Sequence, residues 1–241
     1  MSNLTINIQH PTPIYSRLSS TKIEEACVVE TISYNVGLTA PDPNSNPAPD
    51  PVDPITMQVD FGRNLSYLMS AFPWNNFATA TAPAQTVGVV NMPGGETITG
   101  LTDTNGNTTN LDLEITSAFD GYHANTAATN EVYVSTAAKD CWGTGRDMSA
   151  TIQLQNCNAE RVYDFTFFSS RGYVGDETIF TIGATSVNID HKDETAGSNT
   201  GNITTTVSIT GVSPDANNNI DINVEGTSRY GFINALEITE R

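Results

Sequence analysis

The stretch "NLDLEITSAF" (residues 110–119) decides the fold class, because polar and apolar side chains alternate through it. A period of two is typical of a β-strand with one buried and one exposed face. The apolar face carries Leu111, Leu113 and Ile115, and the polar face carries Asn110, Asp112 and Glu114. The sequence therefore predicts a half-buried strand of an antiparallel sheet.

The same alternation recurs through the chain after residue 55. It is clear in "ATIQLQN" (150–156), "ITTTVSITGV" (203–212) and "IDINVEG" (220–226). Clusters of Gly, Asn, Asp and Ser separate such stretches, as in "DTNGN" (103–107) and "SPDANNN" (213–219), and these residues favour tight turns. Short strands joined by turns predict an all-β fold, a two-sheet antiparallel β-sandwich, most simply a jelly roll.

A proline-rich stretch, "APDPNSNPAPDPVDP" (40–54), divides the chain. It holds six of the twelve prolines, which disfavour helix and sheet, so an extended linker is predicted. Residues 1–39 are too few to build a core of their own, and we expect them to dock on another subunit or assembly. The predicted domains are a docking segment (1–39), a linker (40–54) and a jelly roll (55–241).

The net charge of −17, from 27 acidic and 10 basic residues, excludes several partners. Nucleic-acid backbones and anionic membrane surfaces would repel such a protein. No run of about 18 apolar residues is present, so membrane insertion is not expected. The N-terminal "MSNLTINIQHPTPIYSRLSS" lacks the basic and apolar segments of a secretory signal, which predicts synthesis in a cytoplasm.

Metal-binding patterns in the sequence are weak. Zinc sites need closely spaced ligands, whereas the cysteines and histidines are scattered: Cys27, Cys141, Cys157, His10, His123 and His191. Buried free thiols are favoured for Cys141 and Cys157, although a disulfide between neighbouring strands stays open. Asp103, Asn105 and Asn107 are weak calcium candidates, but their stretch makes an equally good hairpin turn. No cofactor is predicted, with calcium as the alternative left open.

The stretch "AAKDCWGTGRD" (137–147) holds a thiol, an indole and charged groups, as many catalytic loops do. It lacks the strand-to-helix context of a phosphate-binding loop, and the chain has no Gly-x-Ser-x-Gly, His-Glu-x-x-His or Walker motif. A glycosidase or esterase using Asp120 or Asp140 is the alternative. We favour a structural corner of the sandwich, with its glycines in a turn, and no enzymatic activity.

Aromatic and hydrogen-bonding side chains gather in the predicted loops, which is typical of sugar-binding sandwiches. The candidate glycan-binding residues are Trp74, Tyr122, His123, Trp142 and Arg171. The alternative for each is structural, because large aromatic residues often close the ends of a sandwich. Asn234 lies among apolar residues, so it is expected to be buried and bonded to backbone groups as a structural lock.

Several phrases taken together resemble a β-sandwich module that is often appended to secreted bacterial esterases, glycan-degrading enzymes and surface proteins. They are "VDFG" (59–62), "FPWNN" (72–76), "ITSAFDG" (115–121), "DCWGTG" (140–145), "YDFTFFSSR" (163–171) and "YGFINALEI" (230–238). The closing strand is similar to that of the galactose-binding-like jelly rolls. The resemblance implies the fold, and that architecture hosts sugar binders, adhesion modules and spacers alike.

The layout of the chain resembles a virion component, such as a capsid decoration or head fibre protein of a tailed bacteriophage. That resemblance implies a non-enzymatic structural protein on the virion surface, attached to a capsid or to its own copies through residues 1–54. Self-association as a dimer or trimer is expected, with the jelly roll projecting outward and contacting glycans. The alternative is an extracellular or cell-surface carbohydrate-binding module of a bacterial glycan-degrading system.

Overall fold

The computed structural model describes residues 53–63, 69–79, 94–124, 132–145, 148–171, 177–191, 201–227 and 230–241. The predicted docking segment (1–39) and nearly all of the predicted linker lie outside these ranges, so both stay predictions. No helix within the described residues is long and apolar enough to cross a membrane.

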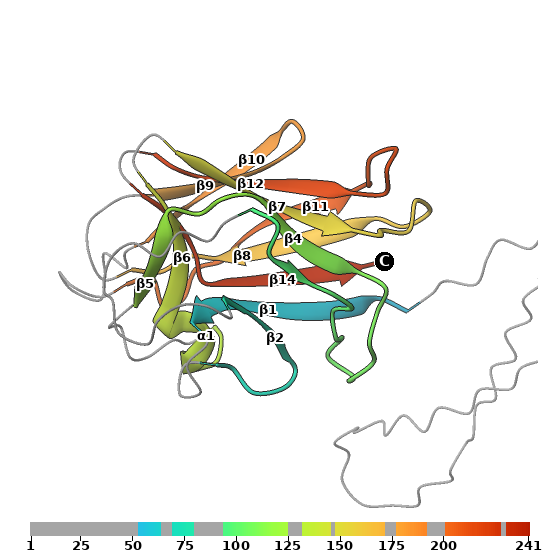
Figure 1. The fold of residues 1–241 in the computed structure, drawn as a ribbon, viewed down its shortest axis with the longest axis horizontal. Helices are drawn as coiled ribbons and strands as arrows, with labels where there is room; N and C mark the ends of the chain where they lie inside the picture. The colour runs from blue at the N-terminus through green and yellow to red at the C-terminus, as the bar shows by residue number, and fades with distance from the viewer. Residues whose placement is uncertain are drawn as a thin grey trace, which may run out of the picture. The chain divides into compact units, whose positions relative to one another are not determined.

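The described residues form two large sheets, one small sheet and a short helix (Figure 1). The five-stranded sheet has the order β11 (Val207–Val212), β8 (Tyr163–Phe168), β14 (Ala235–Glu240), β1 (Ile55–Arg63) and β2 (Trp74–Thr79). The six-stranded sheet has the order β10 (Thr185–Asp190), β9 (Glu177–Ile182), β12 (Ile220–Gly226), β7 (Ser149–Gln155), β4 (Asp112–Ser117) and β3 (Thr97–Ile98). The small sheet contains β13 (Gly231–Ile233), β6 (Asp140–Thr144) and β5 (Gly121–Ala124).

The two large sheets share one apolar core, which confirms the all-β sandwich. The predicted buried face of β4 is correct, since Leu113 and Ile115 are fully buried. Across the layers, the ring of Phe167 in β8 stacks on that of Phe180 in β9, with centroids 4.2 Å apart. Apolar side chains at every second position of the facing strands therefore hold the sheets together.

One strand pair departs from the predicted antiparallel arrangement. β1 and β2 are parallel, with Gln58 aligned to Trp74, while the other paired strands in the described residues are antiparallel. Alternation places side chains on a face but does not encode the direction of the neighbouring strand. The β1–β2 pair is therefore a parallel exception at one edge of an antiparallel sandwich.

The short helix α1 (Ser135–Lys139) is absent from the sequence-based prediction because five residues are too few to show a helical period. Its buried Ala137 and Ala138 pack with Phe168 and Ala235 in a small cluster separate from the main core. Trp74 and Tyr133 pack against the same cluster. The helix therefore covers part of the outer face of the five-stranded sheet.

Candidate functional site

The stretch that contains Trp142 is a buried strand. Residues Asp140–Thr144 form β6 between β13 and β5, so the turn predicted at Gly143 is wrong. Gly145 follows the strand, and its carbonyl oxygen accepts a hydrogen bond from the Met148 N–H at 3.2 Å, as in a turn. The indole of Trp142 is 2% exposed, and its Nε1–H donates to the carbonyl oxygen of Gly62 at 3.2 Å. The indole therefore supports the end of the sandwich and offers no face to a ligand.

The two carboxylates of the glycosidase alternative lie in different surroundings. Asp140 is fully buried, and its carboxylate lies where a Cβ on Gly62 would overlap it. Asp120 is exposed and lies beside Gly145. Asp140 is therefore closed to a substrate that approaches from solvent.

The other predicted glycan-binding residues are spread over the fold. The guanidinium carbon of Arg171 lies 4.6 Å from the ring centre of Phe232. Tyr122 and His123 belong to β5, where Tyr122 is the register partner of Trp142, and their side chains lie outside the described ones. Contacts between described side chains do not join these candidates into one cluster.

Asp103 organises a tight turn, as the hairpin interpretation predicts. Its carboxylate accepts hydrogen bonds from the Asn107 side chain at 3.0 Å and from the backbone N–H groups of Asn107 and Asn105 at 2.7 and 2.9 Å. These bonds, that from the Asn107 side chain foremost, lower the pKa of Asp103. The described residues include no group of three or more His, Cys, Asp or Glu side chains that could hold a metal ion.

Cys141 and Cys157 are both buried, as the sequence favours, and Cys157 is a free thiol. The Cys157 thiol lies 3.7 Å from the carbonyl oxygen of Leu154, and burial raises its pKa to about 12. It is therefore a core residue rather than a nucleophile at neutral pH. Cys27 lies outside the described residues.

A row of side chains crosses the outer face of the five-stranded sheet from edge to edge. Register partners on adjacent strands point to the same face. From β11 to β2 the row contains Ser208, Thr166, Glu237, Gln58 and Trp74. These strands bury most of their apolar residues on the other face, and every member of the row is half-buried or exposed. At the usual strand spacing, the row is about 19 Å long.

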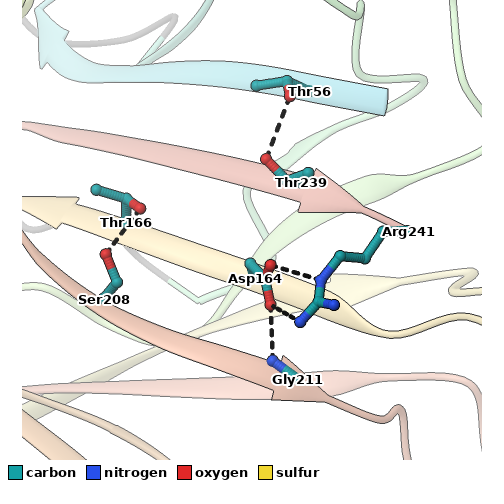
Figure 2. A network of polar contacts seen from close by, with 7 residues as sticks. All are labelled: Thr56, Asp164, Thr166, Ser208, Gly211, Thr239 and Arg241. Atoms are coloured by element: carbon teal, nitrogen blue, oxygen red, sulfur yellow. Dashed lines mark hydrogen bonds and ion pairs between the residues drawn. The ribbon is translucent and has the colours of Figure 1, made fainter. Parts of the chain in front are cut away.

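Hydrogen bonds fix two pairs within this outer-face row. The Gln58 side-chain Nε2 donates to Glu237 Oε2 at 3.1 Å. The hydroxyl oxygens of Thr166 and Ser208, which Figure 2 shows, are 2.9 Å apart. Each group keeps further lone pairs or protons for a ligand. The row is thus a set of polar groups already held in position.

A second polar row lies beside the first, two residues further along the strands (Figure 2). The hydroxyl oxygens of Thr56 and Thr239 are 3.2 Å apart. The Asp164 carboxylate accepts hydrogen bonds from Arg241 Nε at 2.6 Å, from Arg241 Nη2 at 3.0 Å and from the Gly211 N–H at 2.7 Å. The bidentate ion pair keeps this end of the face polar and ordered.

Aromatic rings border the outer-face row at its β2 end. The ring of Trp74 meets that of Tyr133 edge-on at 5.3 Å, and Tyr133 meets Phe168 edge-on at 5.7 Å. Burial, reinforced by the negative charge of Glu237, raises the pKa of Tyr133. Trp74 thus adjoins the fixed polar groups as a partly exposed, supported indole.

Comparisons with known proteins give one similar structure. No family model matches the chain, and no curated protein sequence matches it. The chain is similar to the structure of TmCBM61, a carbohydrate-binding module, in complex with β-1,4-galactotriose. The two share 16% sequence identity over 48% of this chain and 85% of that chain, with a TM-score of 0.27. Values this low transfer no ligand and no binding residue to this protein.

Proposed function

We propose that this protein is a non-catalytic module that binds an extended glycan on the outer face of its five-stranded sheet. The observation that carries the proposal is the outer-face row, which joins a partly exposed Trp74 to four polar side chains across five strands. An aromatic ring beside fixed hydrogen-bonding groups suits a ligand with apolar ring faces and many hydroxyls.

The shape of the row favours an oligosaccharide over a single sugar. Its length of about 19 Å follows from four strand spacings, and the second polar row widens the surface. Hydrogen bonds within Gln58–Glu237 and Thr166–Ser208 already order these side chains. Less conformational entropy is therefore lost when a ligand binds.

A binding role is favoured over hydrolysis by the surroundings of the carboxylates on this sheet. A glycosidase needs a carboxylic acid with a raised pKa that faces the bond to be cleaved. Burial opposes ionisation of Asp164, but the hydrogen bonds from Arg241 and Gly211 outweigh it and lower the pKa of Asp164. Burial raises the pKa of Asp60, but its side chain is 2% exposed and therefore does not face a ligand.

The predicted assembly role concerns a different part of the chain. Attachment to a virion or to other copies was assigned to residues 1–54, nearly all of which lie outside the described residues. That role stays a prediction and is compatible with glycan binding by residues 55–241. Deleting residues 1–54 should abolish attachment and leave glycan binding intact.

The glycan proposal is tested by screening the full chain on a glycan array and measuring affinity for the best oligosaccharide by calorimetry. Trp74→Ala should weaken binding at least about tenfold, because a ring stacked on a sugar is lost. The fall in melting temperature of this variant should be too small to explain the loss of affinity. Tyr230→Ala is the matched control, since Tyr230 is an exposed aromatic residue outside the row. Absence of glycan binding, or equal losses in both variants, would refute the proposal.

A further inference from the structure

A depression of about 380 Å³ opens at the end of the sandwich where β1 begins and β14 ends. Its walls come from the turn before β4, the turn between β7 and β8, and the strand ends at Ile55 and Glu240. In Figure 1 this is the end that carries the C-terminus, whereas β5 and β6 lie at the other end. The volume lies within the range of small-molecule sites.

Amide side chains on these walls are fixed at one end and open at the other. Asn107 Nδ2 donates to Asp103 at 3.0 Å, Asn156 Nδ2 donates to Asp112 at 2.9 Å, and Asn158 Oδ1 accepts from the Glu160 N–H at 3.0 Å. The opposite atoms are Asn107 Oδ1, Asn156 Oδ1 and Asn158 Nδ2, and they form no hydrogen bond within the described part of the chain. Each of these amides therefore keeps one hydrogen-bonding group available to a ligand or to water.

Two more polar side chains line the same depression without partners of their own. The Thr108 hydroxyl and the Asn110 amide make no hydrogen bond to any described residue, and both residues are exposed. The set offers donors and acceptors at short intervals over a partly apolar floor that includes Leu111 and Tyr163. A ligand hydroxyl, which donates and accepts at once, matches such groups.

The negative charge around the depression restricts the class of polar ligand that can bind there. The carboxylates of Asp103 and Glu240 lie in the wall, and Glu240 Oε1 is 3.3 Å from Arg161 Nε. The chain as a whole carries −17, so an anionic ligand would be repelled here. The ligand that fits is neutral and rich in hydroxyls.

We propose that this depression is a second saccharide-binding site, which takes a neutral sugar unit through the amides of Asn107, Asn110, Asn156 and Asn158 and the hydroxyl of Thr108. The inference rests on the proposed function for the ligand class, a saccharide, and uses none of the residues of the outer-face row. One chain then holds two sugar sites, one on a sheet face and one at an end of the sandwich. Such a pair raises avidity for a branched or multivalent glycan.

The test is a nuclear magnetic resonance titration of the full chain with glucose, galactose and β-1,4-galactotriose, following the side-chain amide signals of Asn110 and Asn158. At least one sugar should shift both signals in the unmodified chain and in Trp74→Ala. Thr108→Val and Asn110→Ala should each weaken this binding by roughly fivefold, as expected for one lost hydrogen bond. Asn105→Ala is the matched control, because Asn105 lies in the same turn, outside the depression, with no side-chain hydrogen bond to a described residue.

The outcomes separate the two proposals. Sugar-induced shifts that disappear in Trp74→Ala, with none at Asn110 or Asn158, would overturn the second site and leave the outer-face proposal standing. Equal weakening by Asn105→Ala and Asn110→Ala would also overturn it. If no sugar shifts any signal and the glycan array is blank, both proposals fail.

Discussion

Asn234 accepts a hydrogen bond of 2.7 Å on its side-chain Oδ1 from the backbone N–H of Ser170, and both residues are buried. Its Nδ2 donates to the carbonyl oxygens of Asp140 at 2.9 Å and Ala138 at 3.2 Å. One amide therefore joins the segment after β8, the junction of α1 and β6, and the bend between β13 and β14. The prediction of Asn234 as a structural lock is confirmed.

Asn234→Ala is expected to lower the free energy of unfolding by about 3 kcal/mol or more, because three buried backbone groups each lose a hydrogen bond. Urea unfolding followed by circular dichroism measures this difference. Asn217→Ala is the control, since Asn217 is an exposed residue of another turn. If Asn234→Ala lowers the free energy of unfolding no more than Asn217→Ala does, the role of Asn234 as a lock is contradicted.

Trp142→Phe should destabilise the protein by about 2 kcal/mol while leaving glycan affinity unchanged. The substitution keeps an aromatic ring beside Phe119 but removes the Nε1–H that the buried carbonyl of Gly62 accepts. Chemical unfolding and calorimetry on the same preparation separate the two effects. A loss of affinity without a loss of stability would place Trp142 in a binding site after all.

Because of Asp60, the free energy of unfolding should fall as pH rises from the pKa of this residue in the unfolded chain to its pKa in the folded protein. Asp60 is 2% exposed, its Oδ2 accepts the Ser70 N–H at 3.1 Å, and no described residue hydrogen-bonds to its Oδ1. Burial, which outweighs the bonds from Ser70, raises the pKa of Asp60 from 3.8 to about 6. The folded state therefore binds the proton more tightly than the unfolded state.

The stabilisation by that proton is complete below pH 3.8 and is lost as pH passes through about 6, a change on the order of 3 kcal/mol. Asp60→Asn, which mimics the protonated acid, should flatten the pH dependence over this interval. Urea unfolding across the interval measures it, with Asp53→Asn at an exposed carboxylate as the control. Parallel profiles for Asp60→Asn and the unmodified protein would disprove the assignment.

Gly62→Ala is expected to be strongly destabilising, because the new Cβ would overlap the carboxylate of Asp140. The loss of unfolding free energy caused by Gly62→Ala should be smaller when Asp140 is also replaced by Ala, because the overlapping carboxylate is then absent. A double-mutant cycle on unfolding free energies measures this coupling. Additive effects of the two substitutions would show that position 62 is restricted for another reason.

The sequence predicts strands better than it predicts their neighbours. The alternation in residues 110–119 and 220–226 places β4 and β12 correctly, because side-chain burial is a local pattern. The alternation does not predict that β8 lies between β11 and β14, because that order depends on contacts between distant segments. For the same reason it does not predict that β2 runs parallel to β1.

The candidate site was harder to predict, because its residues are assembled by sheet register. Trp74 was singled out from its sequence context and lies in the outer-face row, but Gln58, Glu237 and Tyr133 carry no recognisable motif. The polar positions in "YDFTFF" (163–168) signal an exposed face and do not name its partners. For Trp142 the structural alternative is correct, because the fold buries this aromatic residue in a strand.

Because the outer-face row is built from five strands spread over most of residues 55–241, no short fragment of the chain can display it. A slip of one residue in any pairing would turn that strand's contribution toward the core. If the proposed function holds, glycan binding would therefore test whether every strand of this sheet has its correct neighbours. The row contains no loop residue, so a change in the length of a connecting segment need not alter it.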